Sequence, residues 1–245
     1  MGNGPKFVLA SLALAVVAIG GRFWMLYHHN QQVLHAPNAA DATPDYTADQ
    51  MVFRKQRHPA FLKDEHGLIG QPVWMAVGGQ LDYYRDTNNH ADYMKSAGTL
   101  DCAEELDIRS VFEQVTPANA AVRIPKGYRQ VLLAFTLPKS TDPKALYAVP
   151  VGDYDNTGYN FLDDQLFYYD DPRQMYKQWG ADTWAHIDKH EVVTGMTENQ
   201  AMMALGQVMQ LHGDTEGDRS ITFYRNGSPI TVDFEKGKAV KVTQG

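Results

Sequence analysis

The stretch Val193-Thr-Gly-Met-Thr-Glu-Asn-Gln200 decides the fold of the C-terminal part of this 245-residue chain. Thr197 and Gln200 match a capping box, in which the Thr hydroxyl accepts the Gln200 amide and the Gln side chain reaches back. Gly206 is a stop signal for the helix that this start predicts. Apolar residues recur between them at helical spacing: Ala201, Ala204, Leu205 and Val208.

Three short strands are predicted after this helix and a polar loop. Ile221–Arg225 alternates as a strand does, and Asn226-Gly227 marks a turn. Residues 230–234 place their apolar side chains on one face, and Val240 and Val242 continue that face after a second turn. One amphipathic helix and a three-strand meander can bury a common core.

The order of these motifs resembles the BamE/SmpA–OmlA family of bacterial envelope modules. The resemblance implies two helices laid on a three-stranded antiparallel sheet, and a protein-binding role in the envelope. It places the first helix at residues 172–189, where Pro172 suits the first helical position and the preceding acids complement the helix dipole. The matching residues are Gly195, Met196, Thr197, Gln200, Leu205, Gly206, Tyr224, Val232, Phe234, Gly237, Lys238 and Val240.

The chain departs from that family at two points. The family places a proline shortly after the Leu-Gly pair, where this chain has Gln207 and Val208. Its assembly-factor members are lipoproteins anchored through a cysteine at the end of the signal sequence, whereas the single cysteine here is Cys102. We therefore expect the domain to be shared and the outer-membrane assembly role not to be.

An apolar run predicts a membrane signal-anchor over residues 7–27. Bilayer crossing needs roughly 20 apolar residues, a length that is reached if Arg22 snorkels to an interface beside Trp24 and Tyr27. Counting only to Gly21 gives a cleaved signal peptide instead, and both alternatives stay open. The flanking charges leave the orientation ambiguous, but the family resemblance favours a single-pass inner-membrane protein with a periplasmic body.

The remaining sequence predicts a β-rich middle domain of the small barrel or sandwich type. Strand-like runs separated by turn residues carry this prediction: residues 72–77, 106–115, 128–137, 145–149 and 165–169. The expected fold class is α+β, with a membrane helix and a C-terminal two-helix, three-stranded domain. The expected segments are an N-terminal flank (1–6), the anchor (7–27), a linker (28–66), the β-rich domain (67–169) and the family-like domain (170–245).

Composition narrows the class of partner and of chemistry. The net charge of −7 is spread along the chain, without the basic cluster that a nucleic-acid-binding surface needs. A single cysteine excludes an intrachain disulfide. The chain has none of the serine-hydrolase, phosphate-loop or dinucleotide motifs, so we assign no catalytic residue and no cofactor.

Two weaker patterns in the sequence indicate candidate binding sites. Asp153, Asp155, Thr157 and Asp164 partly match the ligand spacing of a calcium loop, although Asp, Asn and Gly are also what a polar hairpin turn contains. Exposed aromatic side chains anchor protein interfaces, and core packing is the alternative for such residues. The aromatic residues considered for a binding surface are Tyr168, Tyr169, Trp179 and Trp184.

The leading hypothesis is a membrane-anchored, non-enzymatic protein of the bacterial envelope that binds a protein partner or stabilises a complex. The alternative is a small extracytoplasmic hydrolase, or a ligand- or calcium-binding protein, that uses acids of the β-rich segment.

Overall fold

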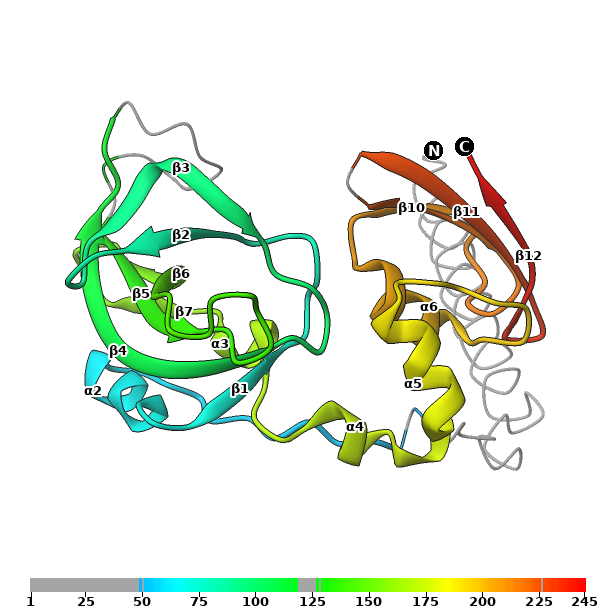
Figure 1. Ribbon diagram of the computed structural model, residues 1–245, viewed down its shortest axis with the longest axis horizontal. Helices are drawn as coiled ribbons and strands as arrows, with labels where there is room; N and C mark the ends of the chain where they lie inside the picture. The colour runs from blue at the N-terminus through cyan, green and yellow to red at the C-terminus, as the bar shows by residue number, and fades with distance from the viewer. Residues whose placement is uncertain (1–48, 50, 119–126, 128, 226) are drawn as a thin grey trace, which may run out of the picture. The chain divides into compact units, whose positions relative to one another are not determined.

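The computed structural model describes residues 49, 51–118, 127, 129–225 and 227–245. The chain from residue 49 onward belongs to one compact unit that contains two antiparallel sheets and several short helices (Figure 1).

Each sheet and the helices beside it form one module of this unit. The first module, which is rich in β-strands, comprises α2 (Leu62–Glu65), η2 (His66–Leu68), β1 (Pro72–Met75), β2 (Asp82–Asp86), β3 (Ala91–Thr99), β4 (Glu105–Val115), β5 (Arg129–Thr136), β6 (Tyr147–Tyr154), β7 (Tyr159–Phe161), α3 (Asp163–Leu166) and β8 (Phe167–Tyr168). The second comprises α4 (Pro172–Met175), η3 (Lys177–Trp179), α5 (Gly180–Asp188), α6 (Glu198–Leu205), β9 (Met209–His212), β10 (Ser220–Arg225), β11 (Ser228–Glu235) and β12 (Lys238–Gln244).

The expected α+β fold class with a membrane helix is wrong for the part of the chain that the structure describes. Most of its regular structure is β, and the longest helix, α5, has nine residues. Among the described residues no helix is long and apolar enough to cross a membrane. Residues 7–27, for which the sequence predicts a single-pass signal-anchor, lie outside the described residues.

The larger sheet has the strand order β3-β2-β6-β5-β4-β1-β8, with β7 paired to β6. Its centre is β5, whose run Val131–Phe135 is almost wholly buried. A strand covered on both faces reads as a continuous apolar run rather than an alternating one. Leu132 and Ala134 pack with Tyr84 and Tyr93 on one face, while their neighbours along the strand join the larger cluster on the other face.

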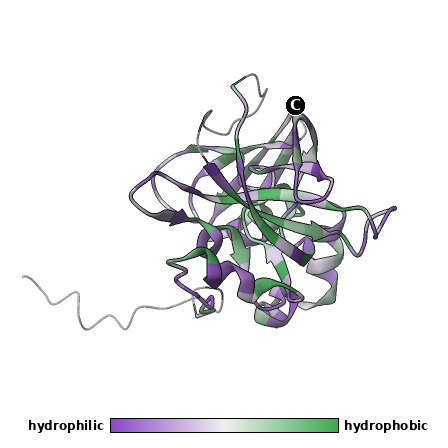
Figure 2. Cartoon of the chain, turned by 90° about the vertical axis from the view of Figure 1, so that its left-hand side faces the viewer, coloured by the Kyte–Doolittle hydropathy of each residue, from purple (hydrophilic) through white to green (hydrophobic). Residues whose placement is uncertain are grey.

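This sheet curls until β4 meets β3. The Gln114 side chain on β4 accepts a hydrogen bond from the Ala91 amide (2.7 Å) and donates to the Ala91 carbonyl (3.0 Å). The Ser110 hydroxyl donates to the Asn89 side chain at 2.6 Å. A side chain thus supplies the two hydrogen bonds that a neighbouring backbone would make. Hydrophobic residues concentrate on the strands around the enclosed core (Figure 2).

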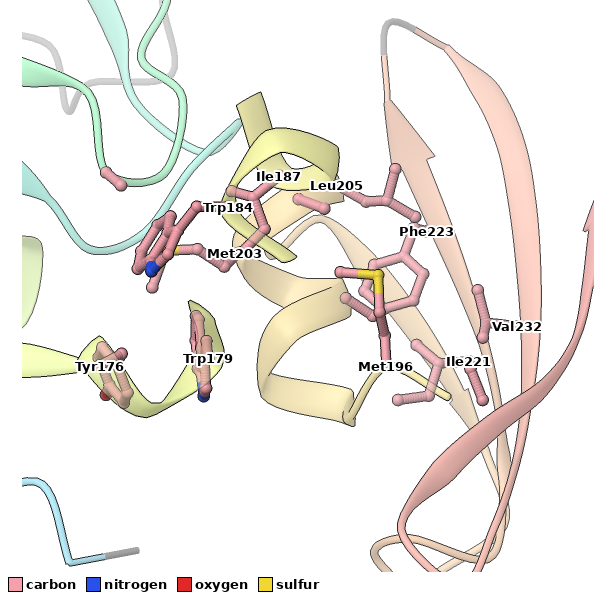
Figure 3. Packing of buried hydrophobic residues seen from close by; sticks show 14 of the residues in the cluster. Tyr176, Trp179, Trp184, Ile187, Met196, Met203, Leu205, Ile221, Phe223 and Val232 are labelled. Atoms are coloured by element: carbon pink, nitrogen blue, oxygen red, sulfur yellow. The ribbon is translucent and has the colours of Figure 1, made fainter. Parts of the chain in front are cut away.

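The smaller sheet has the order β12-β11-β10-β9, and α5 and α6 cover one of its faces. Trp184 and Ile187 from α5 and Leu205 from α6 pack with Ile221 and Phe223 from β10 (Figure 3). The expected three-stranded sheet therefore has a fourth strand, β9, which the sequence did not predict. The expected helix over residues 172–189 is divided into α4, η3 and α5, because the backbone leaves the helical region at Tyr176 and at Gly180.

The capping box predicted at the start of α6 is confirmed. Thr197 accepts the Gln200 amide at 3.2 Å, and the Gln200 side chain accepts the Thr197 amide at 2.8 Å. The helix ends at Leu205, and Gly206 follows with φ +90°. This conformation lies in the left-handed region that favours glycine.

Candidate functional site

The two modules are joined where α6 ends. The Gln207 amide donates to the Gly78 carbonyl at 2.9 Å, and the Gln207 side chain donates to the Ala76 carbonyl at 3.0 Å. A Cβ atom on Gly206 would lie 2.9 Å from the same Gly78 oxygen. Only glycine therefore permits this close approach of the helix end to the β1–β2 loop.

A charged group holds the same joint from the turn between β3 and β4. Both carboxylate oxygens of Asp101 accept from the Arg225 guanidinium, at 2.7 and 3.1 Å. The His190 Nε2 lies 3.6 Å from the carboxylate, and its Nδ1 lies 3.2 Å from the Ala204 carbonyl. Such a two-point Arg–carboxylate contact fixes direction as well as distance. It fixes β10, and with it the sheet edge beside β10, against the β-rich module.

Cys102 belongs to this joint and not to a reactive centre. Its sulfur accepts the Gly78 amide at 3.1 Å and lies 3.5 Å from the Met202 carbonyl of α6. Burial raises the pKa of this thiol to about 11. A thiol of raised pKa is a poor nucleophile at neutral pH, so the cysteine acts as a packed structural residue.

Beyond this joint lies an apolar margin of the smaller sheet, formed by Val208, Met209, Leu211 and Tyr224. Leu211 is 46% exposed although it lies opposite Ile221, which is fully buried. Tyr224 is 40% and Val208 36% exposed. The helices cover the centre of the sheet but not this edge, so the margin presents apolar side chains to solvent on both faces of β9. We take it as the candidate functional site.

The backbone of β9 also presents groups that pair with no other described residue. The Tyr224 amide donates to the Val208 carbonyl at 2.8 Å, and β9 continues in the same antiparallel register along β10. Hydrogen-bonded and non-hydrogen-bonded pairs alternate in such a ladder. Gln210 and His212 therefore bond to β10, whereas the N–H and C=O groups of Met209 and Leu211 point away from it.

A second notable group is a buried acidic cluster in the β-rich module. Glu65 and Asp163 are fully buried, and the Tyr169 hydroxyl donates to Asp163 at 2.6 Å. Asp164 accepts the backbone amides of Arg57 and His58, both at 2.8 Å. Burial, followed by repulsion from Asp163, raises the pKa of Glu65 to about 8.

The buried acidic cluster ties residues 54–58 to α3 and α2. The Arg57 guanidinium donates to the Asp64 carbonyl at 2.6 Å, and that of Arg54 donates to the Phe167 carbonyl at 3.0 Å. Because the acids are enclosed by the fold, we interpret the cluster as structural.

A pocket of about 330 Å³ lies between the β3–β4 turn and the end of α5. The Glu104 carboxylate in it accepts the Asp101 amide at 3.0 Å, and burial raises the pKa of Glu104. The charges that line this pocket are largely neutralised within the protein, and we assign no ligand to it. Three ion pairs do this: Arg173 with Asp188, Lys139 with Glu105 (3.4 Å), and Arg225 with Asp101 (2.7 Å).

The aromatic residues considered for a binding surface lie in the interior. Tyr168, Trp179 and Trp184 are buried in the core of the second module, and Tyr169 is partly buried against the acidic cluster. Tyr176, which stacks on Trp179 with 4.4 Å between ring centroids, belongs to the same core. This placement corresponds to the core-packing alternative for these residues.

The residues considered for a calcium loop are engaged in separate contacts within the protein. Asp155 accepts hydrogen bonds from the Thr157 hydroxyl and amide and from the Gly158 amide, which closes the β6–β7 turn. Asp164 instead holds Arg57 and His58, and Asp153 lies in the β6–β7 pairing. Among the described residues no group of three or more His, Cys, Asp or Glu side chains could hold a metal ion.

The residues of the family motif have mainly structural positions. Gly195 (φ +94°) and Met196 form the turn before α6, and Thr197 and Gln200 cap that helix. Tyr224 differs, since it belongs to the apolar margin. The others are placed as follows: Leu205, Val232 and Phe234 in the core, Gly206 at the module joint, Gly237 in the β11–β12 turn, and Lys238 and Val240 on β12.

Comparison with known proteins does not test these positions. No protein-family model, curated protein or solved structure matches the chain. The resemblance to the BamE/SmpA–OmlA family therefore stays a prediction from the sequence.

Proposed function

We propose that this chain is a non-enzymatic protein-binding component of the bacterial envelope, which binds a partner through the apolar margin of its smaller sheet. The observation that carries the proposal is the exposure of Leu211, Val208 and Tyr224 along one edge of a sheet whose helices cover the centre of only one face. Exposed apolar groups beside polar ones are typical of protein-interaction surfaces.

The module joint supports this proposal. Asp101, Cys102 and Gly78 hold the second module at the end of α6 and at β10. A surface that is held rigid before binding loses less conformational entropy when a partner binds. The β-rich module can thus serve as a support that presents the margin in a fixed conformation.

The test of the proposed function is recovery of a partner by the tagged full chain in its own host, with Leu211→Asp as the disrupting variant. Val240→Asp is the matched control, because Val240 is 43% exposed on the opposite edge strand. We expect the wild type and Val240→Asp to recover the same partner, and Leu211→Asp to recover at least tenfold less. Recovery of the chain alone under several mild conditions would refute the function.

The periplasmic location of the body is part of the same proposal and rests on the family resemblance. An alkaline phosphatase fused to the C-terminus becomes active only outside the cytoplasm, where its disulfides form. We expect an active fusion, whereas a stably expressed but inactive one would place the body in the cytoplasm.

A further inference from the structure

The edges of the two sheets differ in how they are protected. On β12, the Gly195 amide donates to the Ala239 carbonyl (2.8 Å) and the Ala239 amide donates to the Met196 carbonyl (2.7 Å). The turn before α6 thus covers the first half of that edge. Natural proteins commonly cover or distort a sheet edge in this way, because an open edge can pair with another chain.

The larger sheet is protected by other means. The Gln114 side chain bonds to both backbone groups of Ala91 at the start of β3. The pairing of β3 with β2 shifts register at two places, and Lys95 is exposed along the strand. Irregular register and an exposed lysine both oppose pairing with another strand. Strands β7 and β8 have only three and two residues.

β9 differs from these edges. It pairs regularly with β10 over its whole length, and it contains neither lysine nor proline. Its outward N–H and C=O groups, on Met209 and Leu211, have no partner among the described residues. An extended chain laid along this edge would satisfy them and would shield the exposed Leu211 side chain. Strand addition to an open edge is a known mode of peptide recognition.

The charge beside the edge indicates which extended chain fits. The loop that follows β9 exposes the acids Asp214, Glu216 and Asp218. The one basic residue of that loop, Arg219, is already held by Glu198, with a closest contact of 2.6 Å. The end of the free edge is therefore negative, and a lysine or arginine in an added strand would meet opposite charge there.

We propose that β9 is the docking edge for an extended basic segment of a partner protein, which adds to the smaller sheet as a fifth strand. Apolar side chains at alternate positions of that segment pack beside Leu211, and a basic residue lies near Asp214 and Glu216. This inference rests on the proposed function and names the class of partner and the edge that it occupies.

The probe for this docking edge is a synthetic peptide with the sequence of β12, Lys238–Gln244, which contains two lysines and the run Val240-Lys241-Val242. Amide spectra of the isotope-labelled full chain are recorded during titration with the peptide. We expect the largest shifts at Met209 and Leu211, and we expect a peptide with both lysines replaced by glutamate to bind at least tenfold more weakly. No shift up to millimolar peptide, or shifts centred on another edge, would overturn the proposal.

Two variants isolate the edge itself. Leu211→Pro removes an N–H that points away from β10, so it spares the β9–β10 ladder and should weaken peptide binding at least tenfold. Val242→Pro is the matched control, because the Gly245–Pro229 hydrogen bond places the Val242 N–H on the outer side of β12. It should leave peptide binding unchanged. Equal affinities for wild type and Leu211→Pro would overturn the proposal.

Glu216→Lys provides a test that does not depend on proline. It should weaken binding of the lysine peptide and strengthen binding of the glutamate peptide, and unchanged affinities would contradict the charge argument. If the chain dimerises and Leu211→Pro abolishes the dimer, a second copy of the chain occupies the edge. That result would overturn the proposal that a segment of a different protein binds there. If the cellular partner is recovered equally by Leu211→Pro and wild type, the edge is wrong while the protein-binding function stands.

Discussion

Replacing Glu65 by glutamine should change the pH dependence of stability more than any other single neutral substitution in the buried acidic cluster. Glu65 is fully buried, and neither of its carboxylate oxygens has a hydrogen-bond partner among the residues that the structure describes. Burial raises its pKa from 4.5 to about 8, and Asp163 adds to this while Arg57 opposes it. The neutral form is thus favoured in the folded protein, and a neutral amide of similar shape should be tolerated.

The sign and size of this effect follow from proton linkage. The pKa of Glu65 is higher in the folded protein than in the unfolded chain, so neutral Glu65 contributes its full stabilisation below about pH 4.5. The free energy of unfolding then falls as pH rises toward 8, because Glu65 ionises more readily in the unfolded chain. A pKa difference of this size corresponds to an upper bound of about 5 kcal/mol. Since Asp163 and Arg57 respond to the same ionisation, we expect Glu65→Gln to gain about 3 kcal/mol over wild type at pH 9. The gain should vanish at pH 4.

Urea unfolding of the full chain at intervals between pH 4 and 9 measures this difference. Glu216→Gln is the control, because Glu216 is exposed on the loop after β9, and its stability should parallel the wild type. Burial also raises the pKa of Asp163. The stability of Glu65→Gln should therefore still fall as pH rises, but less than that of the wild type. The reasoning is refuted if wild type and Glu65→Gln lose the same stability between pH 5 and 9.

Three further predictions concern the module joint. Because burial raises the pKa of Cys102 to about 11, iodoacetamide at pH 8 should modify it only after unfolding, and mass spectrometry would detect any modification of the native protein. Asp101→Asn and Arg225→Gln should each destabilise the chain, with a coupling energy of about 1–2 kcal/mol in a double-mutant cycle; additive effects would contradict the ion pair. Gly206→Ala should cost more than Gly195→Ala, since both glycines have positive φ (+90° and +94°) but only Gly206 lacks space for a Cβ. Equal losses in thermal unfolding would show that the contact with Gly78 is not tight.

The sequence predicted the central elements of the fold well because their signals are local. The apolar run of residues 128–137 contains β5, and the run 106–115 contains most of β4. The capping box at Thr197 depends on two side chains three residues apart. Each of these signals is contained within a single element and needs no knowledge of its neighbours.

The missed elements are those whose structure is set by their neighbours. β2 and β3 contain several Asp and Tyr residues and few aliphatic ones, because they lie toward one edge of the sheet and bury few side chains. β9 has the sequence Met-Gln-Leu-His, without a β-branched residue, so its intrinsic strand preference is weak. Val208 extends the helical spacing of α6, and only the left-handed conformation of Gly206 ends the helix before it.

The candidate site was missed for the same reason. Trp179 and Trp184 are large aromatics that suggest an interface, yet they form the core. Leu211 has no signal of its own in the sequence, and Tyr224 stands out there only as a residue of the family motif. Both belong to the site because of their place at one sheet edge. A local signal for β9 is the alternation of the apolar Met209 and Leu211 with the polar Gln210 and His212, shortly after Gly206.

The position of β9 explains why the β-rich module contacts the second module where it does. Gln207 bonds to the β1–β2 loop through its amide and its side chain, and the next residue, Val208, already pairs with Tyr224. At the other side of the ladder Arg225 follows Tyr224 directly and is held by Asp101. Both strands that define the free edge are therefore fixed at the same end by the β-rich module. A module that acted only as a spacer would need neither contact, so this arrangement favours a support that keeps the β9 edge open and in register for a partner.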